Sequence, residues 1–226
     1  MIISVHLPKT AGESFAASLK EHFKDKFYKD YHDKPINTPG CKRKTKALCD
    51  MVKNNFINYN NIECIHGHFL PVKYSSLRIY KKIEFITWLR DPIERMASHY
   101  YYWLRNYDPD NAPPLYQKMI KENWSLIDFC FRKELRNFYS QFLWGFPISS
   151  FSFIGIVEYY DDDFQFFQNE IIKTTLKSYR ININPVRSAT SYISDSSLRE
   201  RIEKFHQRDV NLYKMALTQR LLRRGK

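Results

Sequence analysis

The chain has 226 residues, of which 43% are hydrophobic, so it can bury one sizeable core, and we expect a single domain over residues 1–226. Its formal charge of +12 favours anionic partners: nucleic acid, anionic lipid, acidic or sulfated sugar, or nucleotide. The sequence argues against a membrane-spanning protein, because no apolar stretch is long enough to span a membrane. It also argues against a zinc-binding protein, because the four cysteines form no C-x-x-C pair.

The first predicted elements are a strand over Ile2–His6 and a helix over Gly12–Phe23, joined by the turn PKTAG, residues 8–12. A strand, a small-residue turn and a helix can form a cradle for phosphate, because the turn presents backbone N–H groups and the helix N-terminus adds partial positive charge. Lys9 adds a full charge and Ser14 a hydroxyl. With a strand starting at residue 2 there is no room for a signal peptide, so we expect a soluble, cytoplasmic protein.

A polar stretch follows, predicted as an irregular loop over Lys24–Lys46 and a helix over Lys46–Phe56. The next strand, IECIHGH, covers residues 62–68. His66 and His68 are two positions apart, so in a strand their side chains face the same side. They could be packed structural histidines or begin a metal site, but no third ligand is evident, and we expect no metal.

The strand KIEFITWL, residues 82–89, is rich in β-formers and ends at Arg90. Asp91 can cap the next helix, which should run to about residue 105. Arg90 thus stands at the carboxyl end of a parallel strand, where such sheets bind ligands, and Ser98 lies two turns into the helix. Taken alone, Arg90 could equally pair with Asp91 or Glu94.

The remaining elements alternate in the same way. We predict helices over residues 115–142 with a break near Asn123, a strand over 151–160, and helices over 161–175 and 195–222, the last with a break near Gln207. Strands alternating with helices indicate an α/β fold with a parallel sheet covered on both faces.

The ordered pair PKTAGESF and LRDPIERMASHY resembles the sulfotransferases that use 3′-phosphoadenosine 5′-phosphosulfate (PAPS), specifically sulfotransferase family 2 with its glycosaminoglycan 2-O-sulfotransferases. The resemblance implies a P-loop-like fold whose first loop holds the 5′-phosphosulfate and whose second motif holds the 3′-phosphate. It extends to FIGIVEYYDDDF and to a closing segment that could cover the adenosine bisphosphate. The donor-binding residues that it implies are Lys9, Thr10, Ala11, Gly12, Ser14, Phe15, Arg90, Ser98, Arg187 and Ser188.

The resemblance also implies catalytic roles. The hexuronic-acid 2-O-sulfotransferases carry a similar His-Gly-His that supplies the base, so His66 or His68 would accept the proton of the acceptor hydroxyl, and we favour His66. Lys9 would stabilise the bridging oxygen. The implied acceptor is a glycan, glycolipid or glycoside, for which the basic run at residues 42–46 could serve as a guide. Glu13 departs from the family's usual Thr or Ser and would repel a phosphosulfate unless it points away or pairs with a base.

Two alternatives compete with this interpretation. A P-loop kinase would need a Gly before the loop's Lys and a magnesium-binding Ser or Thr after it, and Pro8 stands where that Gly should be. A basic polyanion-binding protein would suit the charge but leaves the two ordered motifs unexplained, and no nucleic-acid-binding signature is present, so we expect no nucleic-acid partner.

Overall fold

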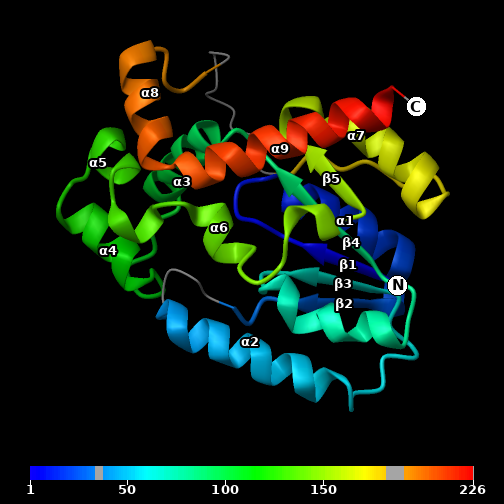
Figure 1. Ribbon diagram of the computed structural model, residues 1–226. Coiled ribbons are helices and arrows are strands. Elements are labelled where there is room, and N and C mark those ends of the chain that lie inside the picture. Colours follow the sequence, from blue (N-terminus) through cyan, green and yellow to red (C-terminus); the bar gives the residue numbers. More distant parts are fainter. Residues whose placement is uncertain (34–37, 182–190, 226) are drawn as a thin grey trace.

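The computed structural model describes residues 1–33, 38–181 and 191–225, built around a five-stranded sheet (Figure 1). The strands are β1 Ile2–Val5, β2 Phe27–Asp30, β3 Cys64–Gly67, β4 Glu84–Leu89 and β5 Phe153–Ile156. Their order is β2-β3-β1-β4-β5 and the four pairings are parallel. The first strand therefore lies at the centre, and the loop after it emerges in the middle of the sheet's carboxyl edge. The expected α/β fold, with a central parallel sheet flanked by helices, is confirmed.

Helices cover both faces of the sheet (Figure 1). They are α1 Gly12–Phe23, α2 Gly40–Asn54, α3 Pro92–Arg105, α4 Pro114–Lys121, α5 Leu126–Cys130, α6 Phe138–Phe142, α7 Tyr160–Phe166, α8 Ser196–Phe205 and α9 Gln207–Arg224, with a 3₁₀ segment η2 Pro71–Ile79 and a π-helix η6 Phe167–Ile172. Within the described residues, no helix is both long and apolar enough to cross a membrane.

The strands alternate their side chains between two cores, as a sheet covered on both faces requires. Ile86 and Trp88 of β4 pack on the side of α1, together with Phe15. Phe85 and Leu89 pack on the opposite side, in the cluster that includes side chains of η2, α6 and α9. A third apolar cluster joins α3, α4, α5 and α8 beyond the carboxyl edge of the sheet. This arrangement leaves the carboxyl ends of the strands facing the N-termini of α1 and α3.

The expected loop over Lys24–Lys46 is wrong, because it contains β2 and the start of α2. In β2 only Asp30 is buried, since the strand forms one edge of the sheet, and so its sequence lacks the apolar pattern of a strand. The basic run is likewise helical, because α2 begins at Gly40 rather than Lys46. Its Arg43 is buried and donates to both carboxylate oxygens of Asp33, at 2.7 and 2.5 Å.

The later predictions hold better. The breaks near Asn123 and Gln207 are confirmed, since α4 ends at Lys121 and α9 begins at Gln207 after α8 has ended. The region predicted as two helices over residues 115–142 forms three, α4, α5 and α6. Asp91 caps α3 as expected, with its side chain accepting from the backbone of Ile93 and Glu94.

Candidate functional site

A cavity of about 720 Å³ opens at the carboxyl edge of the sheet, and both sequence motifs line it. The first motif contributes the turn after β1 and the second the start of α3. The predicted site residues that line the cavity are Lys9, Ala11, Gly12, Ser14, His68, Arg90 and Ser98. Because β1 lies between β3 and β4, stretches that are far apart in sequence meet at this edge.

The turn after β1 contains left-handed backbone angles of a kind that occurs in anion-binding loops. Lys9 and Ala11 adopt left-handed backbone angles, with φ of 68° and 60°, a conformation that turns successive N–H groups toward one concavity. Thr10 between them is buried, and its hydroxyl donates to the Leu7 carbonyl at 2.7 Å. Thr10 therefore shapes the turn rather than lining the cavity.

Lys9 is half-buried at the cavity wall, with its ammonium 3.9 Å from the centre of the Tyr102 ring. Burial lowers the pKa of Lys9 to about 8; the charge of Glu13 opposes this shift, while Arg105 and Arg90 add to it. Glu13 itself is exposed and lines the same cavity, so the unexpected carboxylate acts on the loop's own lysine. The charged side chains that line the cavity are four cations, Lys9, Arg90, Arg105 and Arg180, and three carboxylates, Glu13, Glu158 and Asp161.

His68 lines the cavity, and a backbone contact sets its tautomer. Its Nδ1 lies 2.7 Å from the carbonyl oxygen of His6, and because a carbonyl can only accept, this nitrogen carries the proton in the neutral ring. Nε2 is then left with a free lone pair. Burial lowers the pKa of His68, opposed by the bond to His6 and by Asp33, so the ring is neutral near pH 7.

His66 lies elsewhere, against our preference for it as the base. It is 1% exposed and belongs to the core side of β3, near Phe15 and Phe27. Its Nδ1 lies 2.9 Å from the Ser4 hydroxyl, and burial lowers its pKa to about 3. The strand ends at Gly67, so of these two histidines His68 extends past the sheet and lines the cavity, whereas His66 does not.

A third histidine, His6, was missed by the sequence analysis. It lines the cavity, and its ring is stacked between His68, with centroids 4.5 Å apart, and His66, at 5.2 Å. Its Nδ1 lies 2.9 Å from the Tyr31 hydroxyl. A Cβ on Gly12 would come within 1.9 Å of the His6 ring, so this glycine leaves the space that the ring fills. The sequence feature that could have indicated His6 is its position at the carboxyl end of the central strand.

The backbone of Arg90 is held in place by the Tyr139 hydroxyl. Its N–H donates to the Tyr139 hydroxyl at 3.1 Å, and that hydroxyl donates to the Arg90 carbonyl at 2.7 Å. The guanidinium Nε lies 4.0 Å from a carboxylate oxygen of Glu158, rather than pairing with Asp91 or Glu94. Arg90 and the half-buried Ser98 line the same cavity wall.

The other predicted residues have different positions. Phe15 is buried in the core, 5.4 Å from Trp88 between ring centroids, and supports α1 rather than lining the cavity. Arg187 and Ser188 lie outside the described residues. The chain on either side of that segment reaches the two motifs: Ile181 donates its N–H to the Ser14 hydroxyl at 2.9 Å, and the Ser191 hydroxyl donates to Glu94 at 2.6 Å.

Further residues that were not predicted as site residues also line the cavity. They are His99, Tyr102, Arg105, Tyr179, Arg180 and Tyr192. His99 and Tyr102 belong to an aromatic run on α3 whose Tyr100 and Trp103 are buried in a core cluster, so one helix supplies both core and cavity.

Comparison with known proteins finds similarity over part of the chain. No protein-family model matches the chain. The chain is 33% identical over 119 residues to heparan sulfate 2-O-sulfotransferase 1 of Cricetulus griseus and of Mus musculus, a match covering 51% of this chain and 32% of each relative. The matched region therefore spans about a third of the length of these curated relatives. The similarity to these sulfotransferases extends over about half of this chain.

Among solved structures, a sulfotransferase from Alicyclobacillus acidocaldarius is similar over 95% of this chain and 94% of its own, at 14% identity and a TM-score of 0.47.

Proposed function

We propose that this protein transfers a sulfuryl group from PAPS to a hydroxyl of a carbohydrate acceptor and releases adenosine 3′,5′-bisphosphate. The observation that carries the proposal is that both motifs, Lys9 to Ser14 and Arg90 to Ser98, line one cavity together with His68. Similarity to enzymes named as heparan sulfate sulfotransferases supports the reaction type and a glycan acceptor.

The cavity suits an anionic, nucleotide-sized donor. Its volume of about 720 Å³ lies in the range of small-molecule sites. The turn amides and Ser14 would hold the 5′-phosphosulfate, and Arg90 and Ser98 the 3′-phosphate. The Ser14 hydroxyl accepts from the N–H of Ile181 at 2.9 Å and donates to the Ile181 carbonyl at 3.4 Å. In the proposed complex its proton would turn from this long bond to an anionic oxygen of the donor.

In the proposed step, the acceptor oxygen forms a bond to sulfur while the bond from sulfur to the 5′-phosphate oxygen breaks. The hydroxyl proton passes to Nε2 of His68. The positive charge that develops on the ring is stabilised through Nδ1–H by the His6 carbonyl, which already accepts that bond. Lys9 stabilises the negative charge that grows on the leaving phosphate.

The proposed step assigns charge neutralisation to Lys9 and to the loop. Within the described residues, no group of three or more His, Cys, Asp and Glu side chains is arranged to hold a metal ion. Independence from metal stays a prediction, to be checked by measuring turnover with and without a chelator.

In the decisive experiment, the protein is incubated with ³⁵S-labelled PAPS and each member of a panel of desulfated glycans. The label incorporated into the glycan and the adenosine bisphosphate released are both measured. We expect the two products in equal amounts. A parallel arm with γ-³²P-ATP tests the kinase alternative, and label from that arm alone would overturn the proposal. Oligonucleotide binding without turnover of either donor would instead favour a polyanion-binding protein.

A further inference from the structure

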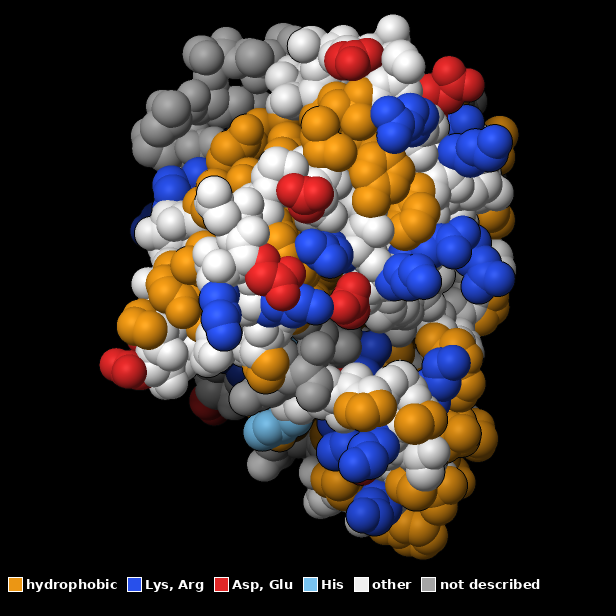
Figure 2. Space-filling model, turned by 90° about the vertical axis from the view of Figure 1, so that its left-hand side faces the viewer, with side chains coloured by type: hydrophobic (Ala, Val, Ile, Leu, Met, Phe, Trp, Pro, Cys, Tyr) orange, Lys and Arg blue, Asp and Glu red, His pale blue; other side chains and the backbone are white. Residues whose placement is uncertain are grey.

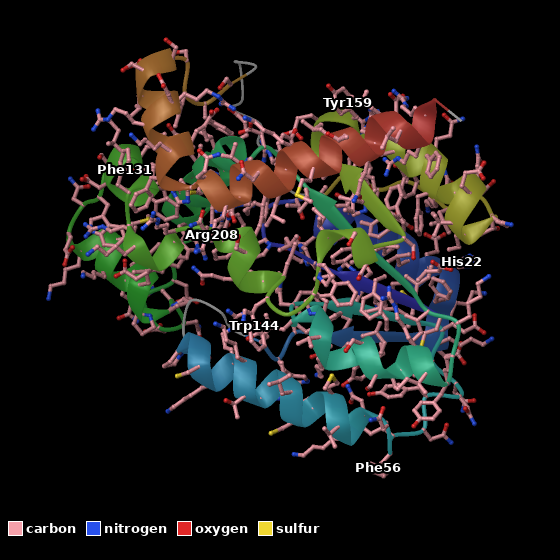
Figure 3. All side chains as sticks on the ribbon, in the orientation of Figure 1. His22, Phe56, Phe131, Trp144, Tyr159 and Arg208 are labelled. Carbon is pink, nitrogen blue, oxygen red and sulfur yellow. The ribbon has the colours of Figure 1, made fainter. Side chains whose placement is uncertain are left out.

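Helix α2 carries an exposed apolar surface that the proposed reaction does not use. Leu48 and Val52 are four residues apart and so lie on one side of the helix, and Phe56 follows in the turn after its end. With Ile57 they form what we call the α2 stripe. Their exposed fractions are 42% for Leu48, 55% for Val52, 86% for Phe56 and 51% for Ile57. In Figure 3, Phe56 projects from the end of α2 away from the body of the protein.

The stripe is not the side by which α2 packs on the fold. That side carries the buried Arg43, Ala47 and Asn54. Asn54 donates to the Lys73 carbonyl of η2 at 2.8 Å, and Ser76 of η2 donates to the Met51 carbonyl at 3.0 Å. None of the four stripe residues belongs to the apolar clusters of the described chain. The helix therefore has a second apolar side, turned to solvent.

Lysines border the stripe. Lys42, Lys44, Lys46 and Lys53 are exposed on α2. The one carboxylate in α2, Asp50, is half-buried and lies 2.6 Å from Lys46 and 3.8 Å from Lys73, so it leaves most of this charge uncompensated. Figure 2 shows lysine and arginine side chains beside hydrophobic ones at the lower end of the molecule, where α2 lies.

We propose that the α2 surface docks onto an anionic lipid bilayer. Apolar side chains flanked by lysines on a helix are the pattern of a segment that lies in a membrane interface, with the apolar side chains among the acyl chains and the lysines among the headgroups. A protein partner fits this surface less well, because protein interfaces are depleted in lysine. The stripe also lies along an exposed helix, and a helix can lie against a flat surface that has no complementary groove. This inference stands apart from the proposed reaction.

Co-sedimentation with vesicles tests the proposal. The whole protein is mixed with vesicles of phosphatidylcholine alone or of phosphatidylcholine with phosphatidylserine. We expect binding to the second kind only, and release by salt, because the screening length falls from about 8 Å at physiological salt to about 3 Å at 1 M. The triple variant Leu48→Ser/Val52→Ser/Phe56→Ser should lose at least about tenfold in partitioning. The variant Lys42→Gln/Lys44→Gln/Lys53→Gln should lose the dependence on phosphatidylserine.

Matched variants on other surfaces serve as controls. Leu221 and Leu222 of α9 are 68% and 66% exposed, so Leu221→Ser/Leu222→Ser removes two exposed apolar side chains away from α2 and should bind like the unchanged protein. Lys118→Gln/Lys121→Gln on α4 plays the same part for charge. Circular dichroism and thermal melting check that each variant folds.

Two results would overturn the proposal. One is equal vesicle binding by the folded stripe variant and the unchanged protein. The other is a protein that does not bind vesicles but self-associates through the stripe. Light scattering would then show an oligomer that the stripe variant does not form, and the surface would join copies of this chain.

Discussion

At the scale of single residues, the two histidines of the His-Gly-His sequence have different surroundings, and we predict that they behave differently. His68→Ala should lower kcat by about 10²–10⁴ and remove the acid limb of the pH–rate profile, because it deletes the proposed base. His66→Asn should change kcat only a few-fold, since His66 is buried beside Ser4 outside the cavity. Initial rates, with calorimetry of adenosine bisphosphate binding to show an intact donor site, check this. The opposite order of effects in folded variants would return the role to His66.

Lys9 should set the alkaline limb. Its pKa is lowered to about 8, and the protonated form is the one that attracts the donor, so kcat/KM for PAPS should fall as pH rises through 8. Lys9→Arg should move this limb upward, because arginine stays charged, while Lys9→Ala should abolish turnover. A pH profile of kcat/KM measures both. An alkaline limb that Lys9→Arg leaves in place belongs to another group.

Arg90 should recognise the 3′-phosphate. Arg90→Ala removes a charge-assisted hydrogen bond, about 1.5–3 kcal/mol, and should reduce the preference for PAPS over adenosine 5′-phosphosulfate, which lacks that phosphate. Titration calorimetry with the two nucleotides measures the preference. Arg180→Ala is the control, since Arg180 also lines the cavity but is exposed and pairs with Asp161 at 2.9 Å. Loss of the preference in the control alone would place the phosphate at Arg180.

At the scale of elements, the junction of the turn with α1 depends on Gly12. A Cβ there would lie 1.9 Å from the His6 ring, so Gly12→Ala should displace the ring that is stacked on His68. We expect weaker donor binding together with lower kcat, measured by calorimetry and initial rates. Gly40→Ala is the matched control, because a Cβ at the start of α2 meets nothing within 4 Å. It should be neutral or stabilise by about 0.4–1 kcal/mol in thermal melting. Full activity of Gly12→Ala would show that the stack is dispensable.

At the scale of the whole molecule, buried histidines should make the fold sensitive to acid. Burial lowers the pKa of five of them: His6, His66, His68, His99 and His206. They are neutral in the folded protein but take up protons in the unfolded chain below about pH 6.5. The contribution of these histidines to the free energy of unfolding should therefore be complete above pH 6.5. Between pH 6.5 and 5 the free energy of unfolding should fall by up to about 1.4 kcal/mol per pH unit for each histidine.

Guanidinium unfolding at several pH values measures this slope. His206→Gln should reduce it, because burial lowers the pKa of His206 in the folded protein. Stability that is constant from pH 7.5 to 5 would contradict the prediction.

Features that depend on neighbouring residues along the chain could be predicted from the sequence alone. The apolar run of β4, the Asp91 cap and the start of α3 are local, because a strand pattern and a capping carboxylate act within a few residues. The turn after β1 and Arg90 at the end of β4 could be recognised in the same way. Strands alternating with helices were enough to predict the parallel sheet.

The tertiary structure decided what depends on residues that meet only after folding. The order β2-β3-β1-β4-β5 brings Lys9, His68 and Arg90 to one cavity, and no local pattern encodes that order. It also separates the two histidines, because α1 covers His66 while His68 extends past the end of β3. Edge strand β2 was missed for the same reason: its polar residues become a strand only through hydrogen bonds to β3, and those bonds form between segments that are distant in the chain.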